Sequence, residues 1–258
     1  MKISVSRLKT YKACPKLFYF KYIENLEPVE KAEALEIGSN YHKRLENLYN
    51  GEEELSDDDF SKERAMVEAY KKYIYPNFKV KSAEDWFEYE LPNGDTLMGI
   101  TDGIAEDGCL VEHKTKGSDI TEQYEYDLMW DEQILAYMLV TGTRTVYYTV
   151  CRKPTIRQKK DETDEEFYQR MVEWYDEDTD SKIRLLKISR TDDEVKQFEK
   201  DLLYFLDNQI PKNTDEQNYY RNTCNCNMYG RRCEFSSVCL NYDPNQMYAQ
   251  FERVERRA

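Results

Sequence analysis

Two tight-turn signals in the middle of the chain set the strongest limit on what it can fold into. Pro92-Asn93-Gly94-Asp95 and Glu106-Asp107-Gly108 favour tight turns because Asn, Asp and Gly adopt the backbone angles that such turns need. The segments beside them favour strands by their residue types and alternation. Three strands are therefore expected in the middle of the chain, at Trp86–Leu91, Thr96–Ala105 and Cys109–Lys116.

Helical spacing dominates the sequence on both sides of these strands. Ser6 is expected to cap a helix that starts at Arg7, and Pro15 is expected to bend it before Leu17–Ile23. The other helices are predicted at Ala34–Tyr49, Lys62–Tyr75, Tyr126–Thr141, Glu165–Tyr175 and Asp192–Asn208, and two more strands at Thr145–Cys151 and Ile183–Ser189. This mixed order of helices and strands predicts an α/β domain.

The net charge of −14 argues against a protein that coats nucleic acid without regard to sequence, because phosphate binding needs many Lys and Arg. The acidity is concentrated, however. Residues 51–60 carry −6 and residues 161–180 carry −9, which leaves 36 Lys and Arg against 35 Asp and Glu in the rest of the chain. Local contact with nucleic acid therefore remains compatible with the composition.

The sequence has no apolar run long enough for a signal-peptide core or a membrane span. We therefore expect a cytoplasmic protein with no membrane partner. In a reducing compartment its seven cysteines are expected to be free, metal-bound or catalytic rather than paired in disulfides.

Three polar residues of the second hairpin are predicted to share one face. With the turn centred on Asp107, Asp102 and Glu112 lie opposite each other, and Lys114 projects from the same face two residues later. Two adjacent carboxylates repel unless a cation lies between them, and Mg²⁺ or Mn²⁺ prefers such oxygen ligands. His113 must point the other way. The alternative is an ordinary Glu–Lys pair on a solvent-facing strand.

This D…E-x-K arrangement resembles the PD-(D/E)XK nuclease superfamily, and three further stretches resemble its RecB-like branch, which includes phage exonucleases and CRISPR-adaptation nucleases. They are SRLKTYKACPKLFYFKYI, GSNYHKRLENL and QILAY. The proline of the family name is absent, since Thr101 precedes Asp102. The resemblance implies a restriction-endonuclease-like core, a central mixed sheet flanked by helices. It places a helical part at 1–80, a nuclease core at 84–210 and a cysteine-rich tail at 211–258, in one nuclease domain.

The resemblance also implies roles for single residues. Asp102, Glu112 and His42 would bind Mg²⁺ or Mn²⁺, and Lys114 would be catalytic. Gln133 and Tyr137 are spaced i,i+4, so both can reach the substrate or support the metal site from one helix face. Packing of Tyr137 in a half-buried helix is the alternative for that pair.

The tail contains a cysteine cluster without the C-x2-C pairs of most zinc ribbons. Its C-x5-C ending and one distant cysteine resemble the [4Fe–4S] pattern of iron–sulfur RecB-like nucleases. That resemblance assigns the cluster to Cys14, Cys226, Cys233 and Cys239, with Cys224 as an alternative to Cys226 and zinc as an alternative to iron. The cluster would join the first helix to the tail as a structural staple. Cys109 and Cys151 are predicted to be core residues.

Residues 144–160 contain six basic residues and no acidic one, which suits phosphate binding. The candidates for nucleic-acid binding are Arg144, Arg152, Lys153 and Arg157, and a solvated strand end is the alternative. Together with the resemblance, the sequence predicts a metal-dependent deoxyribonuclease that acts as an exonuclease on single strands or duplex ends, in phage or prokaryotic DNA processing in the cytoplasm of a prokaryotic or phage-infected cell. A non-catalytic subunit that works with a helicase or recombinase is the competing hypothesis.

Overall fold

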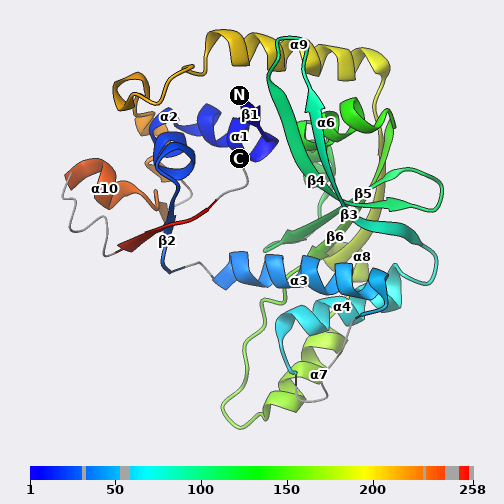
Figure 1. The fold of residues 1–258 in the computed structure, drawn as a ribbon. Coiled ribbons are helices and arrows are strands. Elements are labelled where there is room, and N and C mark those ends of the chain that lie inside the picture. The colour runs from blue at the N-terminus through cyan, green and yellow to red at the C-terminus, as the bar shows by residue number, and fades with distance from the viewer. Residues whose placement is uncertain (31–32, 53–58, 229–230, 242–249, 256–258) are drawn as a thin grey trace. The chain divides into compact units, whose positions relative to one another are not determined.

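The strands of the central sheet form where the two turns predict them. A computed structural model describes residues 1–30, 33–52, 59–228, 231–241 and 250–255 (Figure 1). It divides the chain into two units: Met1–Lys31, Glu88–Gly99 and Gln197–Ala258 form unit 1, and Ala32–Phe87 and Ile100–Lys196 form unit 2. Three elements have residues in both units: β3 (Val80–Glu90), β4 (Thr96–Ala105) and α9 (Asp192–Asn208).

The sheet is mixed. Its strands are β1 (Lys2–Ile3), β3 (Val80–Glu90), β4 (Thr96–Ala105), β5 (Leu110–Lys116), β6 (Thr145–Arg152) and β7 (Ile183–Ser189). The pairs β4–β5 and β6–β7 are antiparallel, β5–β6 is parallel, and β3 and β1 both pair with β4. A parallel pair needs a crossover, and here α5 (Glu122–Leu128) and α6 (Glu132–Thr141) provide it.

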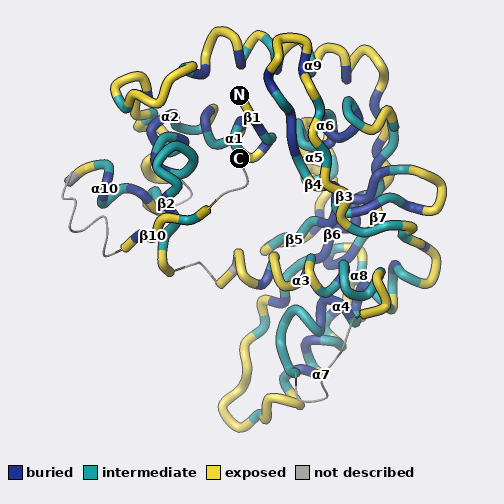
Figure 2. Tube along the Cα trace, in the orientation of Figure 1, coloured by how far each residue is buried: buried dark blue, intermediate teal, exposed yellow. Residues whose placement is uncertain are grey.

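Helices of unit 2 cover both faces of β5 and β6. On one face α3 (Glu33–Asn50) and α4 (Lys62–Tyr73) pack with Val111 and Cys151, and on the other α5 and α6 pack with Leu110 and Tyr148 (Figures 1 and 2). Successive strand residues point to opposite faces, which is why neighbours such as Leu110 and Val111 enter different cores. The predicted α/β fold, a central mixed sheet flanked by helices, is confirmed.

Unit 2 also contains α7 (Asp164–Trp174) and the short α8 (Thr179–Lys182). We expected an exposed helix at α7, but Tyr168 and Met171 are buried against Ala65 of α4. The acidic residues of this region therefore form the solvent side of an amphipathic helix. Of the other acidic segment, residues 53–58 lie outside the described residues.

Unit 1 joins the start of the chain to its end. An apolar cluster contains Phe20, Phe235 and Phe251, and β10 pairs antiparallel with β2. Its further elements are α1 (Val5–Ala13), α2 (Pro15–Phe18), the π-helix η1 (Tyr19–Ile23), β2 (Leu26–Pro28), most of α9 (Asp192–Asn208), η2 (Glu216–Asn218), η3 (Thr223–Asn225), β8 (Asn227–Met228), β9 (Arg231–Arg232), α10 (Ser236–Asn241) and β10 (Phe251–Arg253). In the described part of the chain, no helix is both long enough and apolar enough to cross a membrane.

Local predictions failed where side-chain hydrogen bonds decide a boundary. Ser4, not Ser6, caps α1, because its hydroxyl accepts a hydrogen bond from the Arg7 N–H at 3.3 Å. Pro15 starts α2 after an extended Cys14 instead of bending one continuous helix. Cys151 is buried as predicted, whereas Cys109 is half-buried in the turn before β5.

The helix predicted at Tyr126–Thr141 is in fact two helices, α5 and α6. The break falls at residues 129–131, where Asp131 caps α6 by accepting a hydrogen bond from the Gln133 N–H at 3.1 Å. An Asp at the cap position stabilises a new helix start, so the chain turns there. Met129 and Trp130 remain exposed in the turn.

Candidate active site

The β4–β5 hairpin brings the predicted carboxylates together. Gly103 pairs with Val111 and Ile104 with Leu110, and Gly108 has the positive φ of 80° that its turn requires. Continued by one residue, this register places Asp102 opposite Glu112, as the sequence predicts. The paired residues of β4 and β5 end at Gly103 and Val111. Beyond them, the carboxylate of Asp102 accepts a hydrogen bond from the backbone N–H of His113 at 2.7 Å.

Glu112 is a buried carboxyl group with one partner. Its side chain is 3% exposed, and Oε1 accepts a hydrogen bond from the Lys114 ammonium at 2.6 Å. Its other oxygen, Oε2, is buried and has no hydrogen-bond partner. Burial, together with the negative charge of Asp102, raises the pKa of Glu112 to about 8. The site therefore holds an acid whose charged form is under-compensated.

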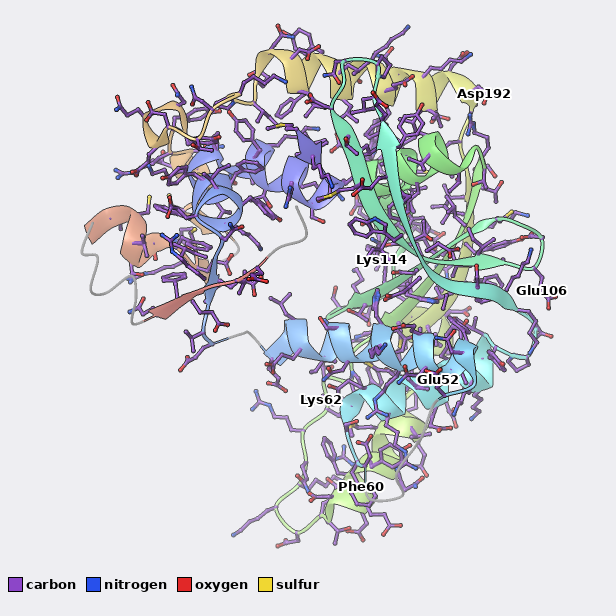
Figure 3. The ribbon with its side chains drawn as sticks, in the orientation of Figure 1. Glu52, Phe60, Lys62, Glu106, Lys114 and Asp192 are labelled. Atoms are coloured by element: carbon purple, nitrogen blue, oxygen red, sulfur yellow. The ribbon has the colours of Figure 1, made fainter. Side chains whose placement is uncertain are left out.

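Lys114, labelled in Figure 3, contacts several polar side chains of the site. Besides Glu112, its ammonium contacts Gln133 Oε1 at 3.2 Å and Asp131 Oδ2 at 3.4 Å. Burial alone would lower the pKa of Lys114, but the carboxylates of Glu112 and Asp131 outweigh it and raise that pKa. Lys114 is therefore a fixed positive charge between two acids.

His42 of α3 lies close to Asp102. Its Nδ1 lies 3.6 Å from Asp102 Oδ1. Burial lowers the pKa of His42, but the Asp102 carboxylate outweighs that effect and the net pKa is raised. For Asp102, burial raises the pKa, and the two neighbouring histidines, His42 and His113, more than reverse this. Asp102 is therefore ionised at neutral pH, unlike Glu112.

His113 points away from the carboxylates, as predicted from its position between Glu112 and Lys114. It is 2% exposed, its ring bonds the Thr149 hydroxyl, and Tyr49 lies 3.1 Å from its Nε2. Burial lowers the pKa of His113 to about 4, so it is neutral at physiological pH. Its backbone N–H donates to the Asp102 carboxylate and helps to hold that side chain in place.

Gln133 and Tyr137 share one face of α6, as their spacing predicts. Gln133 Nε2 donates to the Tyr137 hydroxyl at 2.7 Å, and that hydroxyl donates to the Ile100 carbonyl at 2.6 Å. Gln133 Oε1 accepts from Lys114. The pair therefore links α6 to the catalytic lysine candidate and to β4, two residues before Asp102.

A model of the PD-(D/E)XK nuclease superfamily matches residues 2–240. The chain belongs to this superfamily. No curated protein matches the sequence.

Two solved structures are similar to this PD-(D/E)XK chain. An alkaline exonuclease from Laribacter hongkongensis is 14% identical, with coverage of 80% of this chain and 86% of that one and a TM-score of 0.35. A phage-related exonuclease from Haemophilus somnus is 12% identical, with coverage of 78% and 89% and a TM-score of 0.35.

Nucleases of the PD-(D/E)XK superfamily typically use divalent metals such as Mg²⁺, and the donor set fits one. Asp102 and Glu112 offer carboxylate oxygens, and the orphaned Glu112 Oε2 lacks the partner that a cation would supply. Among the described residues, no three His, Cys, Asp or Glu side chains are already gathered around a common point for a metal. Lys114 contacts Glu112 Oε1 in this arrangement, so Oε2 is the glutamate oxygen that would be open to a cation.

The basic candidates do not form one patch. Arg144 precedes β6 and pairs with Asp192 at 2.6 Å, whereas Arg152 is the last residue of β6 and Lys153 follows it. Arg144 and Arg152 are eight positions apart along the strand, about 26 Å. Lys153 Nζ would lie 3.7 Å from a Cβ built on Gly38, one helical turn before His42. Arg157 is exposed in the following loop. Lys153 therefore lies close to α3, the helix that carries His42.

Four cysteines border one cavity of about 530 Å³ in unit 1: Cys14, Cys226, Cys233 and Cys239. Cys224 is exposed and lies off this lining. Burial raises the pKa of Cys233 and of Cys239, and the thiols of Cys14 and Cys226 add to both shifts. None of the seven cysteines forms a disulfide. Lys16, Arg221 and Arg232 also line the cavity and would offset thiolate charge.

Sequence reasoning missed Asp131. Its side chain is 9% exposed and contacts Lys114, yet the residue was assigned to the middle of a predicted helix. An Asp two residues before Gln133 is a possible helix cap, and that signal was available. Its approach to Lys114 depends on how the crossover packs on β5, which local sequence does not specify.

Proposed function

We propose that this PD-(D/E)XK chain is a Mg²⁺- or Mn²⁺-dependent deoxyribonuclease. It acts as an exonuclease on single strands or duplex ends during phage or prokaryotic DNA recombination, repair or processing. The observation that carries the proposal is the opposed pair Asp102 and Glu112, with Lys114 on the same face and one glutamate oxygen left without a partner.

Asp102, Glu112 and His42 are the residues that would hold the metal. A bound Mg²⁺ or Mn²⁺ would lower the pKa of water and stabilise the charge that develops on phosphorus. Without metal, Asp102 is ionised and its carboxylate accepts the His113 N–H. The charged form of Glu112 is disfavoured by burial and by Asp102, so a nearby cation would stabilise that form.

Lys114 would orient the attacking water or help to move its proton. Its ammonium contacts three oxygen atoms, so it is already held within the site before substrate arrives. Gln133 and Tyr137 would support that position and the substrate from α6. Arg152, Lys153 and Arg157 would contact the DNA backbone, with Arg144 as a more distant contact.

The test compares four DNA substrates: linear end-labelled and circular DNA, each single- and double-stranded, with Mn²⁺ or Mg²⁺. We expect degradation of linear DNA and no cleavage of circles. Glu112→Gln and Lys114→Ala should lose activity, whereas Lys187→Ala, an exposed lysine on β7, should retain it. Wild-type protein that binds DNA but cleaves no substrate with either metal would favour the non-catalytic subunit of a helicase or recombinase complex.

We further propose that Cys14, Cys226, Cys233 and Cys239 hold a [4Fe–4S] cluster, as in iron–sulfur RecB-like nucleases. The common cavity, the exclusion of Cys224 from it and the three cationic side chains support this ligand set. Thiolates suit iron–sulfur clusters and also zinc. Freshly purified protein should be brown and contain iron, and colourless protein with one zinc per chain would contradict the cluster.

A further inference from the structure

The two carboxylate oxygens of Asp131 have different partners. Oδ1 caps α6 by accepting the Gln133 N–H at 3.1 Å. Oδ2 lies 3.4 Å from Lys114 Nζ and accepts a hydrogen bond from the Tyr148 hydroxyl at 3.3 Å. Tyr148 is fully buried in β6, so Oδ2 is fixed from a rigid strand. One side chain thus starts a helix and faces the catalytic lysine candidate.

Lys114 needs such a second anion if Glu112 is to bind a metal. In the structure the ammonium is closer to Glu112, at 2.6 Å, than to Asp131, at 3.4 Å. A divalent cation on the unpartnered Oε2 of Glu112 repels the ammonium that Oε1 holds, because both cations then share one carboxylate. Lys114 is 24% exposed at its side chain, and a largely buried cation without a partner is costly.

We propose that Asp131 is a positioning residue that acts as the counter-ion of Lys114 while Glu112 binds the divalent cation. This inference rests on the proposed nuclease function. To free Glu112 for the metal, the Lys114 ammonium moves a small distance from Glu112 to Asp131. Gln133 Oε1, at 3.2 Å, contacts the ammonium throughout. The ammonium stays beside the scissile phosphate instead of leaving for solvent.

The helix cap and the ion pair can be separated by mutation. Asn and Ser are N-cap residues about as good as Asp, so Asp131→Asn and Asp131→Ser keep α6 capped while they remove the negative charge. The thermal midpoint should stay close to that of wild type, and kcat should fall about tenfold, the low end of the cost of losing an outer-shell partner. The KM for DNA should change little. Thr163→Ala removes the cap of α7 instead, and should lower the midpoint without lowering kcat.

The deciding experiment is Mn²⁺ binding by calorimetry, without DNA, to a double-mutant cycle. In the wild-type background Asp131→Asn should weaken Mn²⁺ affinity about tenfold, because Lys114 then stays on Glu112. In a Lys114→Met background the same substitution should have at most about a third of that effect, because no ammonium remains to be displaced.

Equal weakening in both backgrounds would show that Asp131 acts through its general negative field, and would overturn the inference. Unchanged affinity in Asp131→Asn would also overturn it. If wild-type protein binds no Mn²⁺, the proposed metal-dependent function itself fails. The two failures are therefore distinguishable.

Discussion

Replacement of Glu112 by Gln should stabilise the metal-free protein while it removes activity. The folded protein disfavours the charged carboxylate, since burial and Asp102 raise the pKa of Glu112 to about 8 from an ordinary 4.5. A buried acid with a raised pKa binds more protons in the folded than in the unfolded state between these two values. Wild-type stability should therefore fall as the pH rises from about 4.5 to 8, and level off above that.

The size of the effect follows from the same two pKa values. The difference between about 8 and 4.5 corresponds to at most about 5 kcal/mol at 1.36 kcal/mol per pKa unit. The substitution to glutamine also removes the negative charge that pairs with Lys114, and this loss offsets much of the gain in stability. Because Asp131 and Gln133 still hold the ammonium, we expect a net stabilisation of about 1–2 kcal/mol at pH 8.

The assay is urea unfolding in EDTA at several pH values between 5 and 9. The gap between Glu112→Gln and wild type should grow with pH and become constant above about pH 8. Excess Mg²⁺ should then stabilise wild type and not the variant, by about 2.7 kcal/mol at a hundredfold excess over Kd. A variant that is less stable than wild type at pH 8, or a gap independent of pH, would refute the reasoning.

Three further substitutions test other parts of the structure. Gly103→Ala should destabilise the protein by about 1–3 kcal/mol, because the new Cβ would lie 2.7 Å from the Ser82 carbonyl oxygen. Gly117→Ala, with nothing within 4 Å, is its control, and equal unfolding midpoints for the two would contradict the close approach of β3. Tyr137→Phe should cost about 1–3 kcal/mol and lower kcat, since it removes the hydroxyl that accepts from Gln133 Nε2 and donates to the Ile100 carbonyl. Unfolding and steady-state kinetics measure the two effects, and unchanged values would argue against that link. Cys226→Ser should remove the metal group of unit 1 and Cys224→Ser should not, as measured by iron and zinc content per chain, and the reverse result would exchange the two ligands.

The site residues on the hairpin could be predicted because they depend on local rules. Turn chemistry fixes the β4–β5 register, and the alternation of strand side chains then places Asp102, Glu112 and Lys114 on one face and His113 on the other. The spacing of Gln133 and Tyr137 works in the same way on a helix. These relations need no knowledge of how distant elements pack.

Contacts between distant elements could not be predicted in this way. The resemblance to the nuclease family named His42, but its approach to Asp102 depends on how α3 packs across the sheet. The role of Asp131 is hidden because the apolar pattern runs on through residues 126–141, although α5 ends at Leu128 and Asp131 caps the start of α6. The strands β2 and β10 are too short to leave a periodic signal. Their pairing also joins residues more than two hundred positions apart, which local sequence does not reveal.

The most direct test of the central claim is the Mn²⁺-dependent rate of nucleotide release from linear DNA by matched carboxylate variants. Glu112→Gln should reduce the rate by roughly 10²–10³-fold or more while it keeps the fold, and Glu173→Gln, an exposed glutamate of α7, should match wild type. Wild-type protein without Mn²⁺- or Mg²⁺-dependent cleavage, or a Glu112→Gln variant as active as wild type, would contradict the assignment of this hairpin as the catalytic centre.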